Sequence, residues 1–454
     1  MIPMLHIKIG LRCAVCMMTV LPMLDGCNMT AGIDTLLSAP RLTAQQEEIY
    51  QKLQSAAGVG ISLKYPKSGE HLSAFTFTDL DDDGDDEAIV FYEIAGTAAE
   101  ENPLRVCLLD QYEGAWTAVK DYTTLGAEIE SVSVRKLGAH DRNNLLLCYS
   151  TVDGAAHAVQ VLHYADGSLQ NSLSEKYTVM DVRDLEGDGT NELLLVSAAS
   201  ASEAACIRVY HLDASGSYYQ SELALPDAFT DISRLLYGTY PSDLPSEEEN
   251  GVAVYLDGMT GATTMQTEVI RYFDRKLKLL YADSPENYPA TNRTAGCMSM
   301  DIDGDGEIEI PIQTVFYGYT DAEESEQMPM TSWYVCRGGS LMRKKASYYS
   351  GKNGYVFLLP QRWEKKVTVI SEDDMIVFYT LDAEKTAEEG ELSVGEPLLR
   401  LSVTGDAADA ELKESEGYLL LRQKGDLRYY GKIEAADTPL SLTRSDLLFG
   451  MRYF

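Results

Sequence analysis

Three acidic loops recur along the chain at similar spacing, and this repeat constrains the fold more than any other feature. Each loop has acids at positions 1, 3, 5 and 9 and glycine at position 6, and an apolar run follows it directly. The residues at these positions are Asp79, Asp81, Asp83, Gly84 and Glu87; Asp184, Glu186, Asp188, Gly189 and Glu192; and Asp301, Asp303, Asp305, Gly306 and Glu309.

Two further copies of the loop have lost most of their acids. Position 9 falls at Glu87, Asn144, Glu192, Asn250 and Glu309, which are 57, 48, 58 and 59 residues apart. A period of this size is typical of a stacked or circular array of structural repeats. The chain is therefore predicted to contain at least five repeat units.

The residues between successive loops are typical of β-strands. A short or alternating apolar run enters each loop and a nearly continuous one leaves it. A hairpin follows around turns such as Glu113-Gly114 and Asp166-Gly167. These runs are too short, and too rich in Val, Ile and Tyr, for helices. Four strands per period is the composition of one propeller blade. We therefore predict a mainly β fold, a β-propeller of at least five four-stranded units over residues 70–350.

The segments outside the repeats have a different pattern. Residues 27–69 are predicted to be a linker and a short helix, with Thr43 as the N-cap and Gly58 as the stop. Residues 351–454 lack the acidic loop and are predicted to form a C-terminal antiparallel α+β module. The alternative is that they are two further degenerate blades.

The N-terminal residues 1–26 have the features of a secretory signal. Lys8 and Arg12 lead into an uncharged run ending at Leu24, shorter than the roughly 20 residues that span a bilayer. The following Asp25-Gly26-Cys27 resembles the end of a bacterial lipobox, although Asp25 stands where a small residue is usual. The resemblance implies lipidation of Cys27 and anchoring at the outer face of the cytoplasmic membrane of a Gram-positive bacterium. Ordinary signal cleavage nearby is the alternative.

The charge and the cysteines narrow the possible partners. With 37 basic and 71 acidic residues the net charge is −34. This charge disfavours binding to nucleic acid, and we expect contact with the membrane only through the N-terminal lipid. Beyond Cys27 the cysteines occur singly, several of them in apolar runs, so buried free thiols are predicted.

The acidic loop has the ligand spacing of a calcium site. Calcium takes six to eight oxygens, which side chains at positions 1, 3, 5 and 9 and the backbone carbonyl at position 7 can supply. Position 7 is Asp85, Thr190 and Glu307 in the three loops. An EF-hand needs an acid at position 12 between helices. Here position 12 is Val90, Leu195 and Ile312 and the flanks are strands, so the EF-hand is rejected. We predict about three structural Ca²⁺ sites.

With a strand on each side and a period near 57 residues, the three loops resemble FG-GAP or VCBS repeats, the units of integrin-α-like propellers. The resemblance covers roughly residues 70–350 and implies calcium in the loop that joins the first two strands of a blade. Pro311, early in the strand after the third loop, departs from the pattern because a ladder donor is lost.

No catalytic motif with diagnostic spacing is found in the sequence. We therefore expect a non-enzymatic, calcium-stabilised cell-surface lipoprotein that acts as a binding or adhesion module for an extracellular protein or glycan. One alternative is a polysaccharide-processing enzyme that uses a propeller face, because a pair of carboxylates of the glycosidase kind can be hidden among so many acids. The other is a structural subunit of a surface complex.

Overall fold

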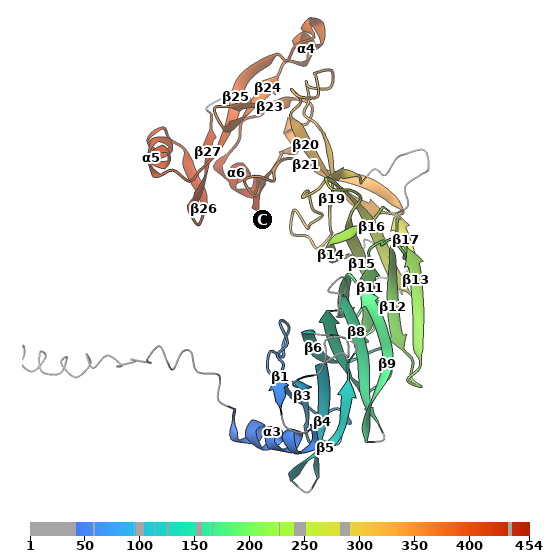
Figure 1. The fold of residues 1–454 in the computed structure, drawn as a ribbon. Coiled ribbons are helices and arrows are strands. Elements are labelled where there is room, and N and C mark those ends of the chain that lie inside the picture. The colour runs from blue at the N-terminus through green and yellow to red at the C-terminus, as the bar shows by residue number, and fades with distance from the viewer. Residues whose placement is uncertain are drawn as a thin grey trace, which may run out of the picture.

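The computed structural model describes residues 42–57, 60–94, 96, 104–112, 114–124, 126, 128–150, 157–165, 167–226, 228–239, 251–281, 291–434 and 438–454. The described chain is mainly β, as the sequence predicts, and is drawn in Figure 1. None of the described helices is both long enough and apolar enough to cross a membrane. The predicted signal segment and Cys27 lie outside these residues.

Five antiparallel sheets, which we number in chain order, follow one another through the described residues up to β22. The first contains β1 (Ile61–Leu63), β2 (Phe75–Thr78), β3 (Glu87–Ile94), β4 (Leu104–Tyr112) and β5 (Ala115–Thr123). The second contains β6 (Glu128–Lys136), β7 (Asn143–Ser150), β8 (His157–Ala165) and β9 (Ser168–Tyr177). The third contains β10 (Val179–Arg183), β11 (Glu192–Ser197), β12 (Cys206–Leu212) and β13 (Tyr218–Ala224).

The fourth and fifth sheets each include a short additional strand. The fourth contains β14 (Asp231–Thr239), β15 (Val252–Met259), β16 (Thr264–Phe273), β17 (Lys276–Tyr281) and β18 (Arg293–Thr294). The fifth contains β19 (Ile310–Val315), β20 (Pro329–Arg337), β21 (Ser340–Ser350), β22 (Tyr355–Leu358) and β28 (Met451–Tyr453). Thus β22 and β28 lie within residues 351–454 but pair with the fifth sheet.

Residues 361–450, called the C-terminal module below, form a sixth antiparallel sheet with short helices. Its strands are β23 (Val367–Glu372), β24 (Met375–Leu381), β25 (Val394–Thr404), β26 (Leu419–Lys424) and β27 (Leu427–Ile433). Its helices are the 3-10 helix η4 (Gln361–Trp363) and the α-helices α4 (Ala383–Glu389), α5 (Ala407–Ser415) and α6 (Arg444–Gly450).

The strand that leaves each loop is called the outgoing strand. Three of them, β3, β7 and β11, are buried on both faces, which explains their continuous apolar sequences, whereas β19 is buried only at its first two residues. In β3, Ile89 and Phe91 pack in the core shared with the second sheet. The alternate residues Ala88 and Val90 pack in the core on the opposite face. The outgoing strands β7 and β11 alternate between two cores in the same way.

The sheets pack face to face in an open, curved row, and other elements cover both ends of it (Figure 1). Helix α3 (Ala44–Ala57) buries Ile49 and Leu53 on the outer face of the first sheet. At the other end, Phe378 of the C-terminal module packs on Phe357 of the fifth sheet. The described residues therefore form a capped row, and a closed propeller ring is not shown among them.

Pro311 shortens the ladder that leads into the fifth sheet. Met300 and Glu309 exchange both of their backbone hydrogen bonds, at 3.1 and 2.9 Å. Two residues further along, the next hydrogen-bonding position of an antiparallel pair falls on Pro311, which has no N–H. The pairing of the strand that enters this loop is accordingly reduced to a single bridge.

Candidate metal centres

The three acidic loops fold in the same way, because their carboxylates accept N–H groups of the loop backbone. The carboxylate at position 1 accepts the N–H of the glycine at position 6, and the carboxylate at position 5 accepts the N–H at position 7. The first of these distances is 3.0 Å for Asp79 and Gly84, 2.8 Å for Asp184 and Gly189, and 2.9 Å for Asp301 and Gly306. The glycines have φ of 96°, 90° and 89°, a conformation that favours glycine.

The glutamate at position 9 begins the outgoing strand or directly precedes it, and is fully buried in all three loops. These residues are Glu87, Glu192 and Glu309. In each, one carboxylate oxygen accepts the N–H of the residue at position 2, at 2.6, 2.9 and 2.8 Å respectively. Burial raises the pKa of all three carboxyls, that of Glu87 to about 7. A buried carboxylate stays ionised most easily next to a positive charge, and the loops differ in how they supply one.

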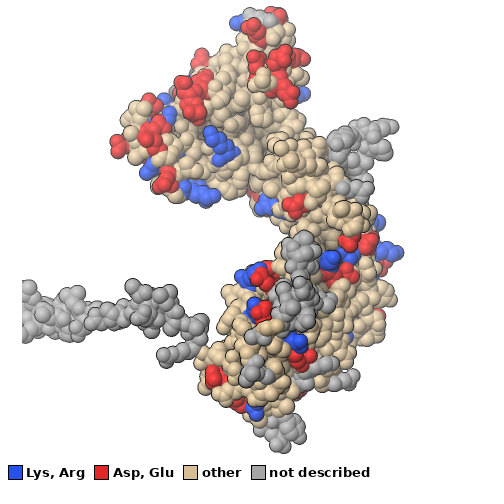
Figure 2. Space-filling view, in the orientation of Figure 1, with Lys and Arg blue, Asp and Glu red and all other residues tan. Residues whose placement is uncertain are grey.

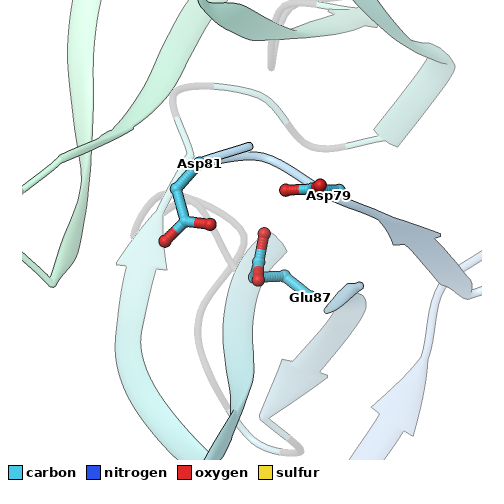
Figure 3. Close-up of side chains that lie close together, drawn as sticks. All are labelled: Asp79, Asp81 and Glu87. Carbon is cyan, nitrogen blue, oxygen red and sulfur yellow. The ribbon is translucent and has the colours of Figure 1, made fainter. Parts of the chain in front are cut away.

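Among the described residues, no lysine or arginine forms an ion pair with the three acids that converge in the first loop. Oxygens of Asp79, Asp81 and Glu87 lie within 4.8 Å of one another, as Figure 3 shows. Asp79 Oδ1 and Glu87 Oε1 are buried and have no hydrogen-bond partner among the described residues. The nearby Lys136 instead pairs with Asp141 at 2.5 Å and reaches the outer Asp82 at 3.8 Å. Two orphaned buried oxygens beside a third carboxylate fit a bound divalent cation.

A fourth acid approaches the first loop from the neighbouring strand. Asp110 in β4 follows Leu109, the partner of Ala88 in the register. After burial, the main cause, the charges of Asp81 and Asp110 contribute to raising the pKa of Glu87, while the N–H of Leu80 opposes them. Asp110 therefore adds to the negative charge that a cation would neutralise.

The second loop satisfies its buried glutamate with protein groups. His211 Nδ1 lies 3.1 Å from Glu192 Oε1, and Thr190 Oγ1 donates to the same oxygen at 3.4 Å. Leu185 N–H occupies the other oxygen. Among the described residues, the acids of this loop do not converge as three carboxylate oxygens, in contrast to the first and third loops.

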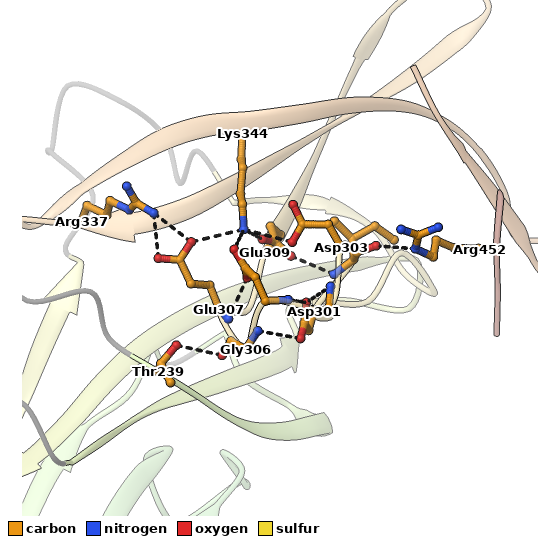
Figure 4. Close-up of polar contacts among 12 residues, drawn as sticks. Thr239, Asp301, Asp303, Gly306, Glu307, Glu309, Arg337, Lys344 and Arg452 are labelled. Atoms are coloured by element: carbon orange, nitrogen blue, oxygen red, sulfur yellow. Dashed lines mark hydrogen bonds and ion pairs between the residues drawn. The ribbon is translucent and has the colours of Figure 1, made fainter. Parts of the chain in front are cut away.

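In the third loop, the side chain of Lys344, which comes from β21, lies at the centre of the acids (Figure 4). Lys344 Nζ lies 3.1 Å from Asp303, 2.5 Å from Asp305, 3.2 Å from Glu307 and 2.6 Å from Glu309. A second cation, Arg337, donates to both oxygens of Glu307 at 2.7 and 2.9 Å. Asp301 and Asp303 also lie within reach of Glu309. The predicted carboxylates therefore converge, but around an ammonium group.

The sequence indicates the acids of the loops but not the residues that face them. Asp83 and Asp85 are exposed in the first loop, outside the group of three carboxylates. The missed residues are Asp110, His211 and Lys344. Asp110 follows the register partner of Ala88 and His211 follows that of Leu193, so the two residues occupy equivalent places beside position 9. This correspondence depends on strand register and is not apparent from the sequence. Nothing in the local sequence marks Lys344.

A cleft of about 620 Å³ lies between the third loop, the fifth sheet and α6. Its lining includes Tyr317, Lys345, Gln361, Phe449 and Arg452. Phe449 is 74% exposed. Arg452 donates to the backbone carbonyls of Ile302, Phe449 and Met451. Figure 2 shows Lys and Arg side chains on the part of the C-terminal module turned toward the inside of the curved row. The cleft thus combines aromatic and cationic side chains with the acids Asp303, Glu364 and Asp446, and Glu364 pairs with Arg343 at 2.7 Å.

Comparison with known proteins adds no family. No family model and no curated protein matches the chain. Among solved structures, an exotype rhamnogalacturonan lyase, YesX, is similar at 13% identity and a TM-score of 0.25, over 71% of this chain and 62% of that one. An exo-β-1,3-galactanase from Clostridium thermocellum is similar at 10% identity and a TM-score of 0.22, over 79% of each chain. The chain thus spans 62% of the first of these structures. Likeness at this level assigns no activity.

The predicted free thiols are confirmed. Cys107, Cys148, Cys206, Cys297 and Cys336 are free, and all but Cys206 are buried. Fold and loops together define a mainly β protein of successive four- and five-stranded antiparallel sheets with acidic loops at one end of the outgoing strands.

Proposed function

We propose that the chain is a calcium-stabilised, non-enzymatic module of the cell surface that binds an extracellular protein or glycan. In this proposal Cys27 carries a lipid anchor, and the sheets are blades of the FG-GAP or VCBS type. The blades form an arc whose end faces are covered by α3 and the C-terminal module. Calcium serves stability, and recognition takes place elsewhere on the surface.

The observation that carries the calcium proposal is the pair of orphaned oxygens in the first loop. Asp79 Oδ1 and Glu87 Oε1 are buried without a hydrogen-bond partner, next to Asp81. Leaving such atoms unpaired costs free energy that a cation would recover. Asp79, Asp81 and Glu87 would hold the ion, and the ion would supply the positive charge that the loop lacks. Because only the folded chain gathers these groups, calcium would stabilise the fold by mass action.

Two single substitutions in the same loop test this proposal. Asp81→Asn removes a charge from the cluster, and Asp82→Asn removes the same charge from a neighbour outside it. Asp82 has φ of 61°, which Asn tolerates well. We expect equilibrium dialysis with Ca²⁺ to show loss of one bound ion in Asp81→Asn and no change in Asp82→Asn. Equal stoichiometry in wild type and Asp81→Asn would contradict the proposal.

The cleft beside α6 is the proposed place of ligand contact. An aromatic ring that is 74% exposed, near Arg452 and Lys345, suits a sugar ring or an acidic group of a partner. Phe449→Ala should abolish binding to a glycan or protein captured on an array without lowering the melting temperature. Leu412→Ala, which truncates a 53% exposed side chain on α5 outside the cleft, is the matched control.

The same array separates the alternatives. Ligand binding without turnover agrees with the proposed module. Hydrolysis or elimination of a bound polysaccharide would favour the enzyme, and binding only to other surface proteins through the row of sheets would favour the structural subunit. Binding unaffected by Phe449→Ala would place recognition outside the cleft.

A further inference from the structure

We infer that Lys344 takes the place of a calcium ion in the third loop, so that this loop is held by protein charges and binds no metal. The inference rests on the proposed calcium site of the first loop, because the two loops share their backbone conformation and their glutamate at position 9. It assigns the calcium dependence of the fold to the first loop and not to the third.

The contacts of Lys344 are those expected of a bound cation. Its Nζ lies within 3.2 Å of carboxylate oxygens at positions 3, 5, 7 and 9 of the loop. Figure 4 shows the Lys344 side chain pointing into the group formed by Asp303, Glu307 and Glu309. The side chain is 19% exposed, and the oxygen it reaches on Glu309 belongs to a fully buried residue. Position 1, Asp301, is occupied by N–H groups of Gly304, Asp305 and Gly306. Calcium and Lys344 would therefore compete for the same oxygens.

The charges also balance as they would around a divalent ion. Lys344 supplies one positive charge to the group, and Arg337 supplies a second through its two hydrogen bonds to Glu307. Among the described residues, the cluster of the first loop receives no ion pair from a lysine or arginine. Two loops that share the hydrogen bonds made by the N–H groups at positions 2, 6 and 7 thus differ in whether the protein provides the cation.

A register irregularity in the fifth sheet explains how Lys344 reaches the loop. Tyr334 pairs with Arg343, and Trp333 pairs with Lys345, so Lys344 is the extra residue at a β-bulge. Bulges re-aim the side chain of the extra residue. The first sheet has the same irregularity, with Leu109 opposite Ala118 and Leu108 opposite Lys120. The extra residue there is Val119, which carries no charge.

Calcium stoichiometry, measured on the folded chain by equilibrium dialysis, tests the inference. In the wild-type chain, Asp303→Asn should leave the number of bound Ca²⁺ ions unchanged, whereas Asp81→Asn should lower it by one. Lys344→Met should raise it by one, because the same carboxylates lose their internal cation. Lys352→Met neutralises an exposed lysine that lies outside the third loop and outside the lining of the cleft, and it should leave the number of bound ions unchanged.

The outcomes separate this inference from the proposed function. Loss of one ion in Asp303→Asn, or no additional ion in folded Lys344→Met, would overturn the role of Lys344 even if the first loop binds calcium. If Lys344→Met does not fold, Asp303→Asn alone decides. A wild-type chain that binds no calcium, with Lys344→Met binding one ion, would refute the proposed first-loop site and still support the inference.

Discussion

Glu87→Gln should change the stability of the first sheet in opposite directions with and without calcium. Gln keeps the size of the side chain and can still accept the N–H of Leu80, which Glu87 accepts at 2.6 Å. It removes the charge from a fully buried carboxylate whose other oxygen has no partner. In the absence of calcium the substitution should therefore stabilise the sheet.

The magnitude follows from the raised pKa of Glu87. Its pKa is about 7 in the folded chain against an ordinary value of 4.5, with burial as the main cause. Because the folded chain holds the proton of Glu87 more tightly than the unfolded chain does, protonated Glu87 contributes to the free energy of unfolding. This stabilisation is fully present below pH 4.5 and is lost as the pH rises through 7. At pH 8 ionisation of Glu87 should cost about 3 kcal/mol. Calcium at about a thousand times its dissociation constant would restore about 4 kcal/mol to the wild-type chain alone.

Hydrogen exchange of the β2 and β3 amides at pH 8 measures this local stability. In chelator, Glu87→Gln should exchange more slowly than wild type, and in saturating calcium the order should reverse. Glu192→Gln and Glu309→Gln are matched controls at the same loop position. Glu192→Gln weakens the contact with His211, and Glu309→Gln weakens the contact with Lys344. Each substitution should therefore destabilise its own sheet both in chelator and in calcium.

Faster exchange of Glu87→Gln in both buffers would refute the reasoning. It would show that the ionised carboxylate is stabilising in the metal-free fold, and hence that the orphaned oxygens are satisfied without a cation. Equal exchange of wild type in chelator and in calcium would refute the calcium part alone.

Three further substitutions or labels test other parts of the structure. Leu53→Ala removes a fully buried side chain between α3 and the first sheet and should cost about 2–5 kcal/mol in urea unfolding; a loss well below this range would show that α3 does not cap the sheet. Asp446→Ala removes the capping box of α6 and should cost about 1 kcal/mol at pH 7. The N–H of Thr443 and the contact with Arg362 lower the pKa of Asp446 in the folded chain. The stabilisation by Asp446 is therefore present above its ordinary pKa of 3.8 and is lost as the pH falls through the lower folded value. A loss of stability in Asp446→Ala that does not depend on pH would contradict this. Burial raises the pKa of Cys107 to about 12, so iodoacetamide at pH 8 should label it only after unfolding, and rapid labelling of the folded chain would contradict its burial.

The repeat and its strands could be predicted because their signals are local. The continuous apolar run around Leu194 is read directly as a strand, and the structure shows why it is continuous, since its residues alternate between two cores. The lost donor at Pro311 is also visible in the sequence, and in the structure the segment that enters the third loop pairs only through the Met300–Glu309 bridge. The docking of α3 and the return of β28 to β22 could not be predicted, because they join segments far apart in the chain.

The acids of the candidate site could be predicted, but their neutralisation could not. Position and spacing identify Glu87 and Glu309 equally well, and in both loops this glutamate accepts the N–H of the residue at position 2. What distinguishes them is a lysine placed by a bulge on another strand, 35 residues after Glu309. Such a contact depends on strand register, which a single sequence does not determine.

The pairing of β28 with β22 has a consequence for the order in which the chain is made. Phe357 and Met451 are partners in adjacent strands, yet Met451 leaves the ribosome after the whole C-terminal module. At roughly 5–20 residues per second, the free edge of β22 waits about 5–20 s for its partner. The first four sheets can close one after another during translation, whereas the fifth stays open until the module has been synthesised. An uncovered strand edge pairs readily with other chains, so this interval is when the nascent protein is most exposed to misassembly.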